Sequence, residues 1–232
     1  MLQFFSKYKL LALVLGVLSI IIISVIYSIL KPIEILPVFQ PSNVSAALVS
    51  PEIQHQKKYH TVGDFSLTNQ NGETVTQATY DDKIYIADFF FTTCQTICPI
   101  MTGNMVLLQK KLRNNPEVLL LSHTVMPEID NVQQLKKYAI EKKIDSNKWN
   151  LVTGAKKEIY TLARKQYLAA KENPDDPLGL VHTENFVLVD TQKRIRGFYD
   201  GTLAQDMDRV MHDISVLQNE GKKSMFFGLI SY

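Results

Sequence analysis

Residues 83–112 read KIYIADFFFTTCQTICPIMTGNMVLLQKKL, and this stretch decides the fold. The run Lys83–Phe91 is almost entirely apolar and rich in aromatic residues, which predicts a strand buried on both faces of a sheet. The run Pro99–Leu112 predicts a helix with proline at its first position. Cys94 and Cys98 lie between the two, so the sequence places a cysteine pair where a buried strand passes into a helix.

The chain has two cysteines, too few for a disulfide scaffold. Unpaired N–H groups and the dipole at a helix N-terminus stabilise a thiolate, which is the nucleophile in disulfide exchange and a ligand for soft metals. The alternatives are two buried structural cysteines or a structural disulfide. Neither requires both cysteines to lie in a loop at a strand-to-helix junction. The sequence therefore predicts that Cys94 and Cys98 form a redox-active or metal-binding pair.

The rest of the chain alternates predicted strands and helices. A hairpin is predicted around the turn Asn69–Gly72. Further strands are predicted at 118–121, 149–152, 185–190 and 194–199, and helices at 132–142, 156–169 and 203–219, with a loop at 171–180. This alternation predicts an α/β fold with a mixed sheet flanked by helices. A cysteine pair between the first buried strand and its helix makes that fold thioredoxin-like, of the peroxiredoxin type.

The N-terminal segment predicts a membrane anchor. Residues 10–30 contain no charge, a length that crosses the hydrocarbon core as a helix, whereas the apolar part of a cleaved signal is shorter. A cleaved signal, helped by the small residues 45–47, is the alternative. The prolines of residues 31–60 predict a spacer rather than a packed segment. The predicted divisions are a cytoplasmic N-terminus (1–9), a transmembrane anchor (10–30), an extracytoplasmic linker (31–60), a folded domain (61–220) and a C-terminal tail (221–232).

Composition excludes a nucleic-acid partner and bears on the compartment. The net charge is only +2, and no lysine or arginine block alternates with aromatic residues. The first nine residues contain no arginine and one serine, which is unlike a mitochondrial transit peptide. The sequence therefore favours a bacterial inner membrane with the folded domain in the periplasm. The mitochondrial inner membrane is the alternative.

Four blocks of the sequence resemble the SCO/SenC family, in order and over about residues 62–219. They are Phe91–Pro99 (FTTCQTICP), Pro127–Asp130 (PEID), Trp149–Gly154 (WNLVTG), and His182 ahead of Phe186–Asp190 (FVLVD). The three residues between the cysteines distinguish this motif from the two of an ordinary thioredoxin. The sequence departs from the family pattern at Gln95, where proline is common, and at Met126, where an acidic residue is frequent.

The resemblance implies a third site residue and a function. It makes His182 a metal ligand together with Cys94 and Cys98, and two thiolates with one imidazole suit Cu(I), with Cu(II) as the alternative. It also implies a copper metallochaperone that delivers copper to, or reduces, the cysteines in the copper site of cytochrome c oxidase subunit II. Another extracytoplasmic protein that contains cysteines is the other partner considered.

A second function from another class uses the same cysteines. In an extracytoplasmic thiol–disulfide oxidoreductase without a metal role, Cys94 attacks a substrate disulfide and Cys98 resolves the mixed disulfide. His182 discriminates between the two functions, because exchange does not require it. A peroxidase is a weaker third interpretation, since Arg113 lies too far along its helix to assist a thiolate.

Other candidate residues have structural interpretations. His123 is expected to be a hydrogen-bonded histidine at a strand end, and Met101 and Met126 are expected to pack in the core. Glu128 and Asp130 form either an exposed acidic patch that binds a partner or a solvated helix N-terminus. His60 is expected to lie on the solvent side.

Overall fold

The computed structural model describes residues 8–30, 34–170 and 184–230, and the chain divides into two compact units, Met1–Glu34 and Ile35–Tyr232. In the first unit, helix α2 spans Lys9–Leu30, and its described side chains are exposed. By length and composition alone, Lys9–Tyr27 can cross a membrane. The helix therefore fits the predicted anchor.

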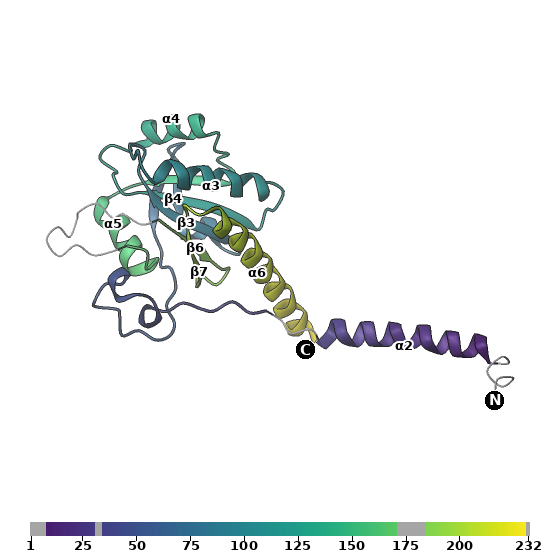
Figure 1. Cartoon of the computed structure of the whole chain (residues 1–232). Helices are drawn as coiled ribbons and strands as arrows, with labels where there is room; N and C mark the ends of the chain where they lie inside the picture. Colours follow the sequence, from purple (N-terminus) through teal and green to yellow (C-terminus); the bar gives the residue numbers. More distant parts are fainter. Residues whose placement is uncertain (1–7, 31–33, 171–183, 231–232) are drawn as a thin grey trace. The chain divides into compact units, whose positions relative to one another are not determined.

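The second unit is built on one sheet of seven strands in the order β2-β1-β5-β4-β3-β6-β7 (Figure 1). Strands β3, β4 and β5 are parallel to one another, and the remaining pairs are antiparallel. The strands are β1 (Ser66–Asn69), β2 (Thr74–Thr76), β3 (Ile84–Phe90), β4 (Val118–Thr124), β5 (Trp149–Thr153), β6 (Asn185–Val189) and β7 (Ile195–Asp200). The predicted mixed sheet is confirmed.

Strand β3 lies in the interior of the sheet, and all seven of its residues are buried. Alternate side chains point to opposite faces, so Ile86 and Phe90 enter one hydrophobic cluster and Tyr85 and Phe89 enter the other. Both faces of the sheet are covered, which explains why the strand reads as a continuous apolar run.

Helices cover both faces of the sheet. Helices α3 (Cys98–Lys111), α4 (Val132–Lys142) and α6 (Ala204–Ile230) contribute buried side chains to the first cluster. Helix α5 (Lys156–Thr161) belongs to the second cluster, on the face opposite α3 and α4 (Figure 1). These helices confirm the α/β architecture with helices on either side of a mixed sheet.

Two helix boundaries differ from the predictions. The helix predicted at 156–169 ends at Thr161 and continues as a π-helical turn, Leu162–Gln166. That turn is followed by Tyr167 and Leu168, which are fully buried in the second cluster, so tertiary packing overrides the regular helical period here. Helix α6 continues to Ile230, beyond the predicted end at residue 219, and the predicted tail begins inside this helix.

The spacer prediction is wrong for residues 35–60, which pack onto the folded unit. The Phe39 N–H donates to the Ile195 carbonyl at 2.9 Å, and the Arg196 guanidinium donates to the Leu36 carbonyl at 2.7 Å. Val49 is buried in the second cluster. The prolines of this segment are interspersed with apolar residues that reach the core, and its backbone forms hydrogen bonds with Ile195 and Arg196 at the start of the edge strand β7.

His60 also differs from expectation. Its side chain is 5% exposed, and its Nε2 atom lies 2.8 Å from the Gln166 carbonyl oxygen. Burial lowers the pKa of His60, although that hydrogen bond raises it in part. The histidine therefore belongs to the packing between the N-terminal segment and the π-helical turn.

Candidate metal and redox centre

Two loops meet at the carboxyl edge of the parallel strands. Strands β3 and β4 are paired in register up to Phe90 and Thr124, so the segments that leave them emerge side by side. The loop after β3 carries the cysteines, and the segment Met126–Asp130 follows β4. Ligand and catalytic groups gather at this edge in open α/β sheets.

Hydrogen bonds to Asp130 connect the cysteine loop to the neighbouring strand β4. The Asp130 carboxylate accepts hydrogen bonds from the Thr92 backbone N–H at 3.0 Å, from the Thr92 hydroxyl at 2.5 Å and from the Thr124 hydroxyl at 2.5 Å. The Asp130 side chain is completely buried, so it is neither an exposed patch nor a solvated helix end. Glu128, by contrast, is exposed and lies 3.5 Å from the Lys156 ammonium. Asp130 therefore has a structural role in the interior, whereas Glu128 lies on the surface.

Helix α4 holds the same loop from a second side. Its N-cap, Asn131, accepts a hydrogen bond from the Gln134 backbone N–H at 3.0 Å. The Gln134 side-chain amide donates to the Thr92 hydroxyl at 2.9 Å. Thr92 is thus the residue through which two elements fix the start of the cysteine loop.

The two cysteines occupy different positions at the start of α3. Cys98 is the first residue of the helix and Pro99 is the second, so the helix begins one residue earlier than the sequence predicts. The Cys98 backbone N–H donates to the Cys94 sulfur at 3.4 Å, and the Thr96 hydroxyl lies 3.6 Å from the same sulfur. Both thiols are free and largely buried, Cys94 at 9% exposure and Cys98 at 3%.

These surroundings give the two thiols different pKa values. Burial raises the pKa of Cys94, but hydrogen bonds from Cys98 and Thr96 outweigh it and lower that pKa to about 7. Burial, together with the hydrogen bond to Cys94, raises the pKa of Cys98 to about 12. The prediction that the helix N-terminus favours a thiolate therefore holds for Cys94, while Cys98 acts as its hydrogen-bond donor.

A buried carboxylate lies behind the pair, on the first-cluster face of β3. Asp88 is 2% exposed, and its Oδ1 atom has no hydrogen-bond partner within the described part of the chain. Burial raises the pKa of Asp88 to about 7, against an opposing hydrogen bond from Ser122. Sequence reasoning missed this residue, although a lone acid inside an apolar strand was a visible signal.

The other candidates are in the core. His123 is fully buried on β4, its ring stacks on Phe89, and its Nδ1 atom lies 3.4 Å from the Asp88 carbonyl oxygen. Burial lowers the pKa of His123 to about 4. Met101 is fully buried in the first cluster, and Met126 packs in part against the second. The structural interpretation of both methionines is confirmed.

The third predicted ligand, His182, lies outside the described residues. The described part of the chain brings Cys94 and Cys98 together and contains no group of three or more potential metal ligands. Two neighbouring sulfurs nevertheless form a donor set that suits a soft cation such as Cu(I). The cysteine pair therefore fits copper, and the role of His182 remains a prediction.

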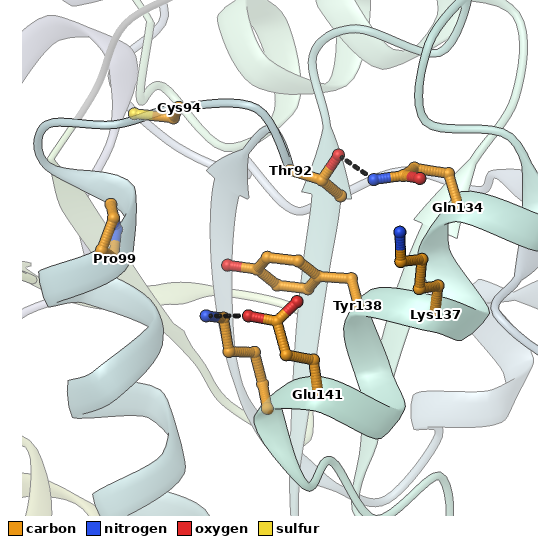
Figure 2. A pocket seen from close by; sticks show the side chains of 8 residues that line it. Thr92, Cys94, Pro99, Gln134, Lys137, Tyr138 and Glu141 are labelled. Atoms are coloured by element: carbon orange, nitrogen blue, oxygen red, sulfur yellow. Dashed lines mark hydrogen bonds and ion pairs between the residues drawn. The ribbon is translucent and has the colours of Figure 1, made fainter.

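A small pocket opens beside the cysteine loop (Figure 2). Its volume is about 140 Å³, and it lies between the loop with Thr92 and Cys94 and the exposed side of α4. Tyr138, whose hydroxyl lies 2.9 Å from that of Thr102, is the most buried residue of α4 in its lining. The centre is thus reached from solvent alongside α4.

Comparison with known proteins places this geometry in a family. The family model for SCO1/SenC matches residues 53–218. The SCO1 protein homolog of Bacillus subtilis is 34% identical over 157 residues, which cover 67% of this chain and 81% of that protein.

Two solved structures share the fold. BsSco, a member of the Sco family of cytochrome c oxidase assembly proteins in which a disulfide switch is identified, is 32% identical with a TM-score of 0.59, over 68% of this chain and 93% of that one. Arabidopsis thaliana ScoI with copper bound is 28% identical with a TM-score of 0.54, over 67% and 98%. The resemblance seen in the cysteine motif is confirmed, and this chain belongs to the SCO1/SenC family.

Proposed function

We propose that this chain is a membrane-anchored assembly factor that carries copper as cargo. Cys94, Cys98 and His182 are the proposed copper ligands. The observation that carries the proposal is the cysteine pair at the start of α3, in a chain of the SCO1/SenC family. Thiolates and a neutral imidazole favour Cu(I), with Cu(II) as the alternative state. A copper-bound structure of a family member, Arabidopsis thaliana ScoI, supports copper as the metal.

The proposed target is the copper site of cytochrome c oxidase subunit II. The support is the family relation to BsSco, a cytochrome c oxidase assembly protein. The target cysteines must be reached on the same side of the membrane as the folded unit. We propose that α2 spans a bacterial inner membrane and holds the unit in the periplasm, which is consistent with the length of its apolar run.

A second candidate function is thiol–disulfide exchange without copper delivery, and the split thiol acidities favour it. Cys94, with a pKa of about 7, is the nucleophile, and Cys98, with a pKa of about 12, is the resolving thiol. Attack by the Cys94 thiolate on a partner disulfide forms a mixed disulfide and releases one partner thiol. Attack by Cys98 then closes the Cys94–Cys98 disulfide and releases the second, so two electrons and two protons pass to the partner.

An anaerobic Cu(I) titration of the reduced full-length protein distinguishes the two functions. The wild type is expected to bind one Cu(I), and His182→Ala is expected to bind it more weakly while keeping disulfide exchange. His55→Ala is the matched control, because His55 is exposed and distant from the motif in sequence. Equal Cu(I) affinity in all three proteins would remove His182 from the site and favour the exchange function.

A further inference from the structure

The pocket beside Cys94 is lined by a lysine, Lys137, that forms no ion pair with any described residue. Thr92 and Cys94 line it from the loop, Pro99 from α3, and Gln134, Lys137 and Tyr138 from α4. Figure 2 shows the Lys137 ammonium directed toward the space beneath Thr92 and Gln134. Among the described residues, no hydrogen-bond acceptor or acidic partner contacts this ammonium.

The other charges at the pocket neutralise each other. The Lys142 ammonium lies 2.7 Å from the Glu141 carboxylate, and it also lies 5.3 Å from the centre of the Tyr138 ring. Lys142 therefore holds the one acid of the pocket, although Lys137 also acts on Glu141 over a longer distance. The two lysines and the glutamate of the lining sum to a net charge of +1, not counting the Cys94 thiolate, and Lys137 is the lysine that has no acidic partner within the described part of the chain.

We propose that this pocket binds an acidic side chain adjacent to the target cysteine in the partner's segment. The inference rests on the proposed function, because it assumes that a cysteine-bearing segment docks at Cys94. A volume of about 140 Å³ accommodates one carboxylate side chain. The partner segment is one in which a glutamate or aspartate precedes a cysteine, and Lys137 selects it by charge.

The pocket acts on the first step of exchange. The Cys94 thiolate attacks the sulfur of the partner cysteine, a new S–S bond forms, and the partner's own disulfide breaks to release a thiolate. Cys98 then attacks Cys94, so the protein becomes oxidised to its disulfide and the partner is reduced to a dithiol. An ion pair between the partner acid and Lys137 holds the segment during the first attack and raises its rate.

The test uses reduced full-length protein in non-ionic detergent and peptides closed by one disulfide. The residue before the first peptide cysteine is Glu, Gln or Lys, and the second-order rate constant for protein oxidation is measured at low ionic strength. Each rate is divided by that of dithiothreitol with the same peptide, which removes differences in intrinsic reactivity. The Glu peptide is expected to react about threefold to tenfold faster than the Lys peptide, as for a partly exposed ion pair.

Charge reversal on α4 provides the decisive comparison. Lys137→Glu is expected to invert the preference, so that the Lys peptide becomes the faster one. Lys136→Glu is the matched control: it changes the net charge equally, but Lys136 faces away and donates to the Asn71 side chain at 2.6 Å. Lys136→Glu is expected to keep the preference for the Glu peptide.

Three outcomes would overturn the inference. The wild type could react equally with all peptides, or the two reversals could change the preference equally, which would indicate a general field effect. Both outcomes leave exchange at Cys94 and Cys98 intact, and neither bears on the proposed binding of copper. Exchange with none of the peptides would also overturn the inference, and the Cu(I) titration would then decide the proposed function separately.

Discussion

Removing the Asp130 carboxylate should loosen the cysteine loop. The side chain is completely buried and accepts hydrogen bonds from the Thr92 N–H, the Thr92 hydroxyl and the Thr124 hydroxyl. A hydrogen bond to a charged group contributes about 1.5–3 kcal/mol, and a buried donor left without a partner costs about 1–3 kcal/mol. Both hydroxyls can rotate toward other acceptors, so the lower ends of these ranges apply.

For Asp130→Ala we therefore expect a loss of roughly 3–5 kcal/mol in the free energy of unfolding. Asp130→Asn keeps the shape and one acceptor oxygen, so its expected loss is about 1–2 kcal/mol. Urea unfolding of the reduced protein measures both. Glu128→Ala is the matched control, because its exposed ion pair with Lys156 should contribute less than about 1 kcal/mol.

A coupled change at Thr92 tests the mechanism behind this loss. Thr92→Val removes the hydroxyl that bonds to Asp130 and to the Gln134 amide, and its effect should not add to that of Asp130→Ala. The rate of Cys94 alkylation should also change in Asp130→Ala, because the loop is then free to move. A loss below about 1 kcal/mol in Asp130→Ala, or full additivity with Thr92→Val, would refute the proposed anchoring role.

Three further predictions concern the thiols, the buried acid and the N-terminal segment. Alkylation of the reduced protein should show one fast thiol whose rate rises with a midpoint near pH 7, because the Cys94 pKa is about 7; two equal thiols with midpoints near 9 would contradict this. Asp88 has a pKa raised from 3.8 to about 7, so its contribution to stability is full below about pH 3.8 and is lost as pH rises through 7. Asp88→Asn should therefore stabilise the fold by roughly 1–3 kcal/mol more at pH 8 than at pH 5, measured by urea unfolding; a gain that does not change with pH would show that Asp88 is not held protonated. A chain that starts at residue 61 should unfold at least about 3 kcal/mol more easily than one that starts at 35, because it loses buried Leu36 and Val49; equal stability would restore the spacer interpretation.

The sequence predicts the central strand and the start of α3 well, for local reasons. A continuous apolar run from Lys83 to Phe91 has few alternatives to a strand buried on both faces, and proline after Cys98 fits the first turn of a helix. The hairpin turn is equally local, since Gly72 adopts a positive φ of 80°. These features depend on neighbouring residues, which the sequence displays directly.

The features that the sequence does not predict depend on contacts between distant segments. Asp130 looks like a surface acid until the parallel pairing of β3 and β4 brings Thr92 to it. The segment 35–60 looks like a spacer because its prolines are conspicuous. Its apolar residues pack against parts of the fold that are distant in sequence, such as β7. Lys137 is one of several lysines on α4, and only the position of the cysteine loop gives it a pocket.

X-ray absorption at the copper edge of the loaded, reduced protein tests the central claim most directly. The account predicts a first shell of two sulfurs and one nitrogen, from Cys94, Cys98 and His182, and no copper at this site after the cysteines are oxidised, since a disulfide sulfur is a poor soft ligand. His182→Ala should lose the nitrogen and keep the sulfurs. A shell of sulfurs only, unchanged in His182→Ala, would contradict the proposed copper site.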